Sequence, residues 1–415
     1  MPRPPVADAP QASLFLPAPL PVAALDDRGR LACLRLIRSE NVGPVTFREL
    51  INHYGGAEEA LAALPEISRR AGRGRALKLC AREVAEAELE AAAKVGAVPV
   101  FTIEPGYPAR LAEVDVPPPL LYVKGRMDLL ARPMLAIVGS RDASAAGIKL
   151  TGMLSVDLGR AGFVIASGLA RGIDGAAHRA AIGCGTVAVL AGGIEVIYPP
   201  EHARLYVEIA ERGCLITEMA PGYKPRAQDF PRRNRIISGI LLGVIIVEAA
   251  KRSGTLVTAR YAGEQGREVF VIPGHPLDPR AEGTNGLIKA GATLVTTAAD
   301  ILEVLGPITG ERPLWNLSEN RAENLGRPIA KLQTEAAVGP PFSGSPSASP
   351  DMVVDADRDR IAAALGPHPV DIDALVRATG LPIRAVQIAL MELDLSGRIE
   401  RHGAQLVSLK SASPD

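Results

Sequence analysis

The stretch Ala136-Ile137-Val138-Gly139-Ser140-Arg141 passes from an apolar run into a glycine, a hydroxyl side chain and an arginine. The next residues, Ala143-Ser144-Ala145-Ala146-Gly147, are compatible with the start of a helix. A strand that ends on glycine and leads into a helix exposes backbone N–H groups, where an anion is favoured. Ser140 adds a hydroxyl donor, and Arg141 adds a guanidinium that can grip a phosphate through two hydrogen bonds. Taken alone, the stretch also fits a tight turn with a surface arginine.

Apolar runs of strand length recur along the chain, and most of them end in a glycine or another small residue. Continuous apolar strands separated by helices predict a parallel sheet that is covered on both faces. The expected fold is therefore an α/β domain with an extended Rossmann-like parallel sheet, whose ligands bind beyond the carboxyl ends of the strands. The expected strands are Leu135–Val138, Phe163–Ala166, Val187–Leu190, Leu215–Thr217, Val244–Val247, Val269–Ile272 and Thr293–Val295.

A second glycine-containing loop, Ser167-Gly168-Leu169-Ala170-Arg171-Gly172-Ile173-Asp174-Gly175, lies between an expected strand and an expected helix. Gly168 and Gly172 allow the backbone to approach a ligand closely. Arg171 is expected to meet a phosphate, and Asp174 is a candidate cap for the following helix. The loop is not a G-x-G-x-x-G dinucleotide fingerprint, because no acidic residue follows the next strand as that fingerprint requires.

The third loop, Phe230-Pro231-Arg232-Arg233-Asn234-Arg235, carries three arginines within four positions beside an aromatic ring. Arg233, Asn234 and Arg235 lead into apolar residues, which predicts a helix start whose side chains reach a cleft. Phe230 is expected either to stack on a base or to pack. A solvated basic face is the alternative. Further cations lie nearby in the sequence: Lys224, Arg226, Lys251, Arg252 and Arg260. The only acidic residues in this region are Asp229 and Glu248.

Three more loops follow expected strands or helices at the same edge of the sheet. One precedes an expected helix and offers hydroxyl groups and a lysine, a combination suited to phosphate oxygens at a helix N-terminus. The residues expected to contribute from these loops are Lys251, Ser253, Gly254 and Thr255, then Pro273 and Gly274, with Gly283-Thr284-Asn285-Gly286 beyond them.

Nothing near these loops predicts a catalyst. The chain has no P-loop lysine motif, no supported set of Ser/His/Asp or Cys/His residues, and no acidic metal cluster. A catalytic role for His178, one turn into the helix after the second loop, is not favoured. The loops are therefore expected to bind phosphate groups without catalysing a reaction, and neither a cofactor nor a metal is expected.

The chain has 415 residues, which predicts two or three domains. Lys+Arg and Asp+Glu both number 46, so a nucleic acid would have to be held by a local basic patch rather than by bulk charge. No export signal and no membrane-spanning apolar run is found, so a cytoplasmic protein without a membrane partner is expected. The four cysteines, Cys33, Cys80, Cys184 and Cys214, are expected to be reduced thiols.

The block before the α/β region has apolar residues at helical spacing. Two of its expected helices flank Asn41-Val42-Gly43-Pro44-Val45-Thr46, in which Thr46 is a candidate N-cap with Glu49 three residues later. This pattern is typical of a helix-hairpin-helix element, which can present backbone N–H groups to a DNA phosphate. The alternative is a small helical packing module, because the hairpin carries few basic side chains.

The last block reads as two helices, the turn Thr379-Gly380-Leu381-Pro382, a third helix and two short strands, which is a winged-helix pattern. Its candidate recognition helix, Ile383 to Asp394, carries Arg384 against Glu392 and Asp394. That surface is poorly suited to a DNA groove. A protein-contact or regulatory role is therefore favoured for this module.

A linker rich in proline, serine and glycine, 339–350, precedes the winged helix and cannot bury a core. The expected organisation is a disordered tail (1–27), a helical domain (28–115), a Rossmann-like DNA-binding domain (116–307), a linker (308–354), a winged-helix domain (355–409) and a tail (410–415).

The loop motifs together resemble the DprA (Smf) family of DNA-processing proteins. They stand in the family's order over roughly residues 109–295, and as a set they are specific, although each is weak alone. The flanking blocks also look like the family's helical N-terminal module and its optional winged helix. The motifs are Val138-Gly139-Ser140-Arg141, Ser167-Gly168-Leu169-Ala170-Arg171-Gly172-Ile173-Asp174, Phe230-Pro231-Arg232-Arg233-Asn234-Arg235-Ile236-Ile237-Ser238-Gly239, Ser253-Gly254-Thr255 and Pro273-Gly274.

The resemblance implies a protein that binds single-stranded DNA through its Rossmann domain and has no established catalysis. It implies that the protein protects incoming strands and passes them to the RecA recombinase in natural transformation, as a homodimer formed through the same domain. Carried over to matching positions, the phosphate pocket is Gly139, Ser140, Arg141, Gly168 and Gly172, and the basic rim is Arg232, Arg233 and Arg235, with Asn234 and Phe230 as further contacts.

Two other functions stay open. A nucleotide-processing hydrolase resembling the lysine-decarboxylase-like phosphoribohydrolases would carry Pro-Gly-Gly-x-Gly-Thr-x-x-Glu. The nearest stretch here, 251–257, lacks that catalytic glutamate, which leaves a phosphate cradle without its acid–base group. The other is a winged-helix transcription regulator with a ligand-sensing domain.

Overall fold

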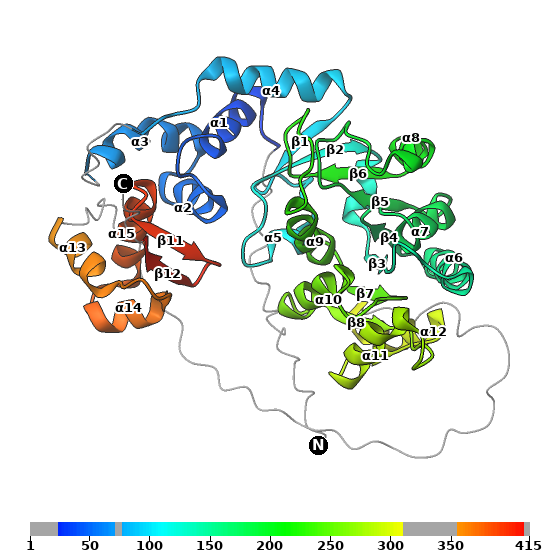
Figure 1. Cartoon of the computed structure of the whole chain (residues 1–415). Coiled ribbons are helices and arrows are strands. Elements are labelled where there is room, and N and C mark those ends of the chain that lie inside the picture. Colours follow the sequence, from blue (N-terminus) through cyan, green and yellow to red (C-terminus); the bar gives the residue numbers. More distant parts are fainter. Residues whose placement is uncertain (1–23, 71–76, 310–354, 411–415) are drawn as a thin grey trace, which may run out of the picture.

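The computed structural model describes residues 24–70, 77–309 and 355–410, which form a helical module, an α/β domain and a winged helix (Figure 1). The tails expected at 1–27 and 410–415 and the linker expected at 308–354 lie almost wholly outside the described residues.

A nine-stranded sheet forms the centre of the molecule, in the order β1-β2-β6-β5-β4-β3-β7-β8-β9. Every neighbouring pair from β6 to β9 is parallel, which confirms the extended Rossmann-like sheet. Each expected strand is present to within one residue at either end. The strands are β1 (Val98–Phe101), β2 (Leu120–Gly125), β3 (Met134–Val138), β4 (Val164–Ser167), β5 (Thr186–Val189), β6 (Cys214–Thr217), β7 (Gly243–Ile246), β8 (Glu268–Val271) and β9 (Thr293–Leu294).

β1 and β2, which precede the Rossmann unit, were not expected, and each pairs with its neighbours in antiparallel orientation. β2 pairs with β6, and β1 pairs with β2 at the edge of the sheet. The helical domain expected over 28–115 is therefore wrong at its end, because β1, at Val98–Phe101, belongs to the sheet. β1 is only four residues long and lies between a helix and a proline-rich turn, so it offers little periodicity to distinguish it from a helix.

Side chains alternate along the strands and enter two cores. Leu135 and Ile137 of β3 pack on one face with helices α6, α7 and α12, whereas Ala136 and Val138 pack on the other with α9 and α10. Because both faces are buried, the strands read as continuous apolar runs. The helices and short 3-10 turns of this domain are α5 (Ala109–Ala112), η1 (Met127–Ala131), α6 (Ala145–Arg160), α7 (Ile173–Ala181), η2 (Pro200–His202), α8 (Ala203–Arg212), α9 (Asp229–Gly239), α10 (Thr255–Glu264), η3 (Pro279–Ala281), α11 (Glu282–Lys289) and α12 (Ala298–Thr309).

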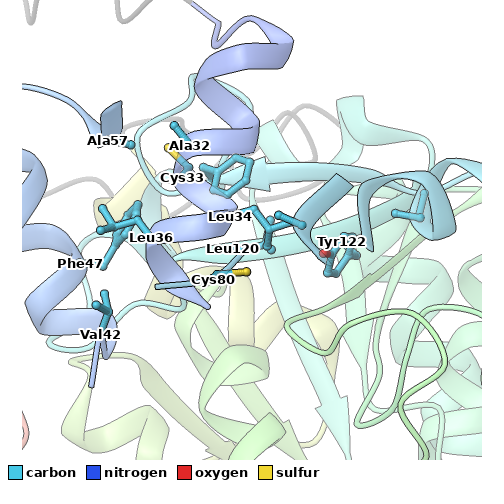
Figure 2. Packing of buried hydrophobic residues seen from close by; sticks show 14 of the residues in the cluster. Ala32, Cys33, Leu34, Leu36, Val42, Phe47, Ala57, Cys80, Leu120 and Tyr122 are labelled. Carbon is cyan, nitrogen blue, oxygen red and sulfur yellow. The ribbon is translucent and has the colours of Figure 1, made fainter. Parts of the chain in front are cut away.

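The N-terminal helices share a core with the sheet. Leu34 and Leu36 of α1 pack beside Phe47 of α2 and toward Leu120 and Tyr122 of β2 (Figure 2). The helical module is thus fused to the α/β domain by apolar packing. Its helices are α1 (Asp27–Ile37), α2 (Pro44–Tyr54), α3 (Ala57–Arg70) and α4 (Arg82–Lys94).

The hairpin between α1 and α2 differs from the expectation in one respect. Helix α2 begins at Pro44, and its N-cap is Gly43, which has no side chain to cap it. Thr46 is therefore not the N-cap but lies inside the first turn, because proline with its fixed φ favours the first helical position. The Thr46 hydroxyl donates instead to the carboxylate of Asp394 in the winged helix, at 2.5 Å.

The C-terminal block is a winged helix, as expected. Figure 1 shows it in orange and red, beside α2 and α3. Its recognition helix, α15, packs against both α2 and α3. The elements are α13 (Asp355–Ala364), β10 (Val370–Asp371), α14 (Ile372–Thr379), α15 (Ile383–Leu395), β11 (Ile399–His402) and β12 (Leu406–Leu409).

Within the three described ranges, no single helix is long and apolar enough to cross a membrane; only α14 and α15 taken together, bent by 114°, meet that length and composition.

Candidate functional site

The loops singled out in the sequence converge at the carboxyl edge of the parallel strands. β3 lies between β4 and β7: β4, β5 and β6 follow one another on one side of β3, and β7, β8 and β9 follow on its other side. Such a reversal of strand order opens a crevice between neighbouring loops, and ligands of open α/β sheets bind there. The loops after β3, β4, β5 and β7 therefore frame the candidate site.

Glycines allow the first two loops to pack backbone against backbone. Gly172 has φ +71° and ψ −123°, and Ile173 donates its N–H to the carbonyl of Ser140 at 3.2 Å. A Cβ on Gly172 would lie 2.7 Å from the carbonyl oxygen of Arg141 and still closer to that of Ser140. A Cβ on Gly139 would lie 2.6 Å from the Ile173 side chain. Both glycines thus hold the loops together, and neither presents an open cradle.

A cavity of about 260 Å³ lies beside these loops, between α9 and the segment after β5. Five of the residues expected to bind phosphate line it: Arg141, Gly168, Arg171, Phe230 and Arg233. The cavity wall is completed by residues of the segment after β5 and of the turn before α9, including Gly192, Tyr198, Pro200, Glu201 and Pro225.

The mouth of the cavity carries a cation and two aromatic rings. The Arg141 guanidinium carbon is 5.9 Å from the centroid of the Phe230 ring, within cation–π range. The Tyr198 ring also packs against Phe230, with ring centroids 5.2 Å apart and planes at 54°. Arg141 is exposed, and Tyr198 is 50% exposed. These groups can therefore meet a ligand without rearrangement of the core.

Tyr198 was missed from the sequence. It follows β5 by nine residues, in a stretch without the glycine-rich loop and helix start that marked the other sites. The usable signal was the parallel sheet itself, because any aromatic residue in the segment after a neighbouring strand reaches the same edge.

Arg233 is not on an open basic rim, contrary to the expectation. It is 6% exposed, and its Nη1 donates to the carbonyl oxygens of Gly168, at 2.8 Å, and of Val189. Burial lowers the pKa of Arg233 to about 10, whereas the nearby negative charge of Asp174 opposes this shift. The residue stays charged at neutral pH and joins the ends of β4 and β5, because it donates to a carbonyl at each of them.

Asp174 also has a different role from the helix cap that was expected. Its Oδ2 accepts the N–H groups of Gly168, at 3.0 Å, and Ala170, at 3.4 Å, so it ties the loop after β4 to the start of α7. Burial raises the pKa of Asp174, and Arg233 opposes that shift. The loop is thus fixed from one side by a carboxylate and from the other by a guanidinium.

The other two arginines of this motif share an internal counter-charge. The Glu218 carboxylate is 3.1 Å from Nε of Arg232 and 2.5 Å from Nη2 of Arg235, and its side chain is only 8% exposed. Arg235 also donates to the carbonyl of Val116 at 3.1 Å. The expected basic rim therefore carries less free positive charge than the sequence suggested, because Glu218, just after β6, pairs with both arginines. No pattern in the sequence indicates that Glu218 lies beside them.

The helix start after Arg141 is also occupied by the chain itself. Glu248, just beyond β7, accepts from the backbone N–H of Ser144 at 3.0 Å and from its hydroxyl at 2.5 Å. This carboxylate lies where the positive end of the α6 dipole favours an anion. The phosphate site expected at this helix N-terminus is therefore filled, and the accessible cations lie beside it, at Arg141 and Arg171.

The loop after β7 adjoins the site but is mostly engaged in tethers. The Thr255 hydroxyl donates to the Gly139 carbonyl at 3.1 Å, and Asn234 Nδ2 reaches the Gly254 carbonyl at 3.4 Å. The Ser253 hydroxyl accepts the Thr255 N–H at 3.2 Å. Exposed Lys251 pairs with Glu282 at 3.2 Å. This loop thus connects α9 to the loop after β3.

Pro273 and Gly274 lie outside the cavity lining. Asn285 holds this loop with two hydrogen bonds, accepting from the Gly274 N–H at 3.2 Å and donating to its carbonyl at 3.0 Å. A Cβ on Gly274 would be too close to Ala281, so this glycine serves packing.

His178 lies in the core and does not line the cavity. His178 is fully buried, and its Nδ1 lies 2.7 Å from the Thr186 hydroxyl. Burial lowers the pKa of His178 to about 3, so its imidazole is neutral at physiological pH. Within 24–70, 77–309 and 355–410, no three His, Cys, Asp or Glu side chains are grouped so that they could hold a metal ion.

A larger cavity, of about 1380 Å³, lies at the opposite edge of the sheet, beside the amino ends of β3, β4 and β7. Met134, Phe163 and Leu242 contribute to its largely apolar wall. Because ligands of parallel sheets bind at carboxyl ends, the smaller cavity beside Arg141 is the candidate site.

The fold and the site define a Rossmann-type α/β protein whose candidate site carries guanidinium groups beside aromatic rings. The region 99–306 matches the family model described as DNA recombination-mediator protein A, 27–91 matches a DprA-like N-terminal HHH domain, and 345–405 matches a DprA winged helix domain. The chain belongs to the DprA family of DNA-processing proteins, as the resemblance of its motifs implied.

The similar proteins align with between about half and three quarters of this chain. Protein Smf of Escherichia coli strain K12 is 39% identical over 309 residues, which cover 74% of this chain and 76% of that protein. DNA processing protein DprA of Streptococcus pneumoniae is 45% identical over 207 residues, or 49% of this chain and 73% of that protein. The X-ray structure of DNA processing protein A from Streptococcus pneumoniae superposes with a TM-score of 0.56 at 34% identity, covering 68% of this chain and 98% of that one.

Replacing Gly172 by alanine tests the packing of the two loops. We expect Gly172→Ala to lower the free energy of unfolding by roughly 1–3 kcal/mol, because its backbone conformation is strained for any residue with a Cβ. Gly152→Ala is the matched control: Gly152 lies inside α6 with no atom near its missing Cβ, so alanine adds up to about 1 kcal/mol. Chemical denaturation measures both. Equal stability of the two variants would contradict the loop packing.

Replacing Arg233 separates support from ligand contact. Removing one member of a buried charge network costs about 3–5 kcal/mol, so Arg233→Ala should lower the unfolding midpoint strongly. Arg141→Ala should leave stability within about 0.5 kcal/mol of the parent, because Arg141 is exposed. Thermal denaturation of the two variants decides the matter, and a stable Arg233→Ala protein would show that this guanidinium is dispensable to the loop.

Proposed function

We propose that this protein binds single-stranded DNA at the carboxyl edge of its Rossmann sheet. The observation that carries the proposal is the exposed Arg141 guanidinium beside the Phe230 and Tyr198 rings, at the mouth of a cavity between two fixed loops. A guanidinium neutralises and hydrogen-bonds a phosphate, and an aromatic ring stacks on a base. The three side chains together suit one nucleotide with its adjoining phosphate.

The arrangement favours a single strand over a duplex. In a duplex the faces of the bases are stacked on one another, whereas an open strand leaves them free for an aromatic ring. Arg171 is exposed at the cavity and can meet a phosphate next to the one held by Arg141. Two accessible cations at one edge fit successive phosphates of a strand better than a single mononucleotide.

The finer role rests on the family. We propose that the protein protects incoming single strands and loads the RecA recombinase onto them in natural transformation. In this role it would act in the cytoplasm as a homodimer formed through the Rossmann domain. The family description as a recombination mediator and the relatives named DNA processing protein support this role.

We further propose that the protein acts by binding rather than by turnover. Three carboxylates beside the loops are engaged: Glu248 accepts from Ser144, Glu218 meets two arginines, and Asp174 holds the loop after β4. Glu201, in the cavity wall, stays exposed. The stretch 251–257, however, lacks the glutamate that serves the nucleotide hydrolases as their acid–base group, which favours a binding protein over such a hydrolase.

Binding of a fluorescent oligothymidylate tests the site. Tyr198→Ala should weaken binding by about 1–3 kcal/mol, the typical value for loss of one base-stacking ring, while Tyr198→Phe should retain it. Arg141→Ala should also weaken binding and should reduce the slope of log affinity against log salt by about 0.7, the value for one phosphate on a single strand.

The matched control is Arg212→Ala. Arg212 is an exposed arginine in the last turn of α8, paired with Glu208 and remote from the carboxyl edge. It should leave affinity and salt slope unchanged. If Tyr198→Ala and Arg141→Ala both behave like Arg212→Ala in fluorescence anisotropy, the cavity is not the binding site.

The RecA role is tested by filament growth on single-stranded DNA that is already covered by a single-strand-binding protein. The parent chain should shorten the lag of RecA assembly, whereas Arg141→Ala should not, because it holds the strand poorly. A parent chain that binds DNA tightly yet leaves the lag unchanged would contradict RecA loading while sparing the binding site.

A further inference from the structure

The recognition helix of the winged helix has two buried faces. Val386, Leu390 and Leu393 of α15 belong to the core of the winged helix itself. Met391 and Leu395 belong instead to the core shared with the N-terminal helices, and Ile388 packs against that core. The second set recurs at three- and four-residue spacing, which defines a second apolar stripe along one side of the helix.

A partly buried polar network fixes the register of this contact. Arg401 of β11 lies 2.7 Å from Glu49 of α2 and 3.1 Å from Asp394 of α15, and its side chain is only 8% exposed. Asp394 also accepts from the Thr46 hydroxyl at 2.5 Å. Burial raises the pKa of Glu49, and Arg401 opposes that shift. Buried charges must meet their own partners, so the network selects one docking geometry.

The same contact covers the hairpin between α1 and α2. Asn41, the first residue of the hairpin, donates its Nδ2 to the carbonyl of Leu395 at 3.0 Å. Gly397 faces Asn41 closely, since a Cβ on Gly397 would lie 3.2 Å from Nδ2. The wing adds a third tether, from the Ala404 N–H to the Asp115 carboxylate at 3.0 Å. The hairpin is thus closed by the end of α15.

The hairpin between α1 and α2 and the recognition helix α15 both have the form of DNA-binding elements, and here each covers the other. A recognition helix must enter a major groove about 12 Å wide, which is little more than the diameter of a helix. With α2 and α3 along one side, α15 cannot do so. A helix-hairpin-helix must present hairpin N–H groups to a phosphate, and here the end of α15 lies over that hairpin.

We propose that the winged helix is a protein-binding module whose partner is the N-terminal helical module of the same chain, and that their docking closes the hairpin and α15 to duplex DNA. The closed chain then binds nucleic acid only at the Rossmann site. Separation of the two modules exposes an apolar stripe and the hairpin together. One contact therefore controls both surfaces.

The test uses the full chain with Met391→Asp and Arg401→Ala combined, which removes the apolar stripe and the buried cation. Arg398→Ala, an exposed arginine of the same module, is the matched control. Hydrogen exchange should accelerate at least about tenfold at hairpin and α2 amides in the double variant, since a broken buried pair costs several kcal/mol. The Arg398→Ala chain should match the parent.

Duplex binding is the second readout. If the closed form of the parent chain is about ten times more populated than the open form, the double variant, which is open, should bind duplex DNA about ten times more tightly than the parent. Oligothymidylate affinity should stay constant, which separates this result from any failure of the Rossmann site. Unchanged exchange at α2, or accelerated exchange without gain in duplex affinity, would overturn the proposal.

A cysteine pair gives an independent readout of the contact. Thr46→Cys and Asp394→Cys replace two side chains that meet across the interface. The paired chain should form an intramolecular disulfide on mild oxidation and then bind duplex no better than the parent, whereas either single variant should form none. Failure of the pair to cross-link would show that the modules are apart in solution.

Discussion

The Arg233 guanidinium lies behind the loop that follows β4, where it donates to the carbonyls of Gly168 and Val189 and faces Asp174. Three elements far apart in sequence, α7, α9 and the end of β5, are joined at this point. Because Asp174 binds the N–H groups of the same loop, the backbone beside Arg141 has little freedom. The exposed side chains at the cavity mouth depend on this buried support for their positions.

Electrostatics in this domain is largely internal. Two positions at which the sequence predicted a bound anion are taken by carboxylates of the chain itself. Glu218 lies between Arg232 and Arg235, and Glu248 lies at the start of α6. A chain with equal numbers of acids and bases cannot rely on net charge. It offers an anion only those cations that its own carboxylates leave exposed, and Arg141 and Arg171 are such residues.

The sequence was sufficient for the parallel strands, the winged helix and the family, because buried strands and turn residues leave local signals. It could not reveal which arginines are buried. Three arginines lie within four positions of the chain: Arg232, Arg233 and Arg235. Arg233 supports a loop, whereas the other two pair with Glu218. This difference depends on partners that are distant in sequence. Tyr198 and β1 were missed for the same reason, since neither carries a local pattern.

Photocross-linking of an oligothymidylate containing 5-iodouracil tests the central claim most directly, because cross-links form only where a base touches a side chain. The account predicts that mass spectrometry will find the cross-link in peptides that contain Tyr198 or Phe230, the two rings at the cavity mouth. Cross-links confined to the winged helix or to α2, with none at these rings, would contradict it.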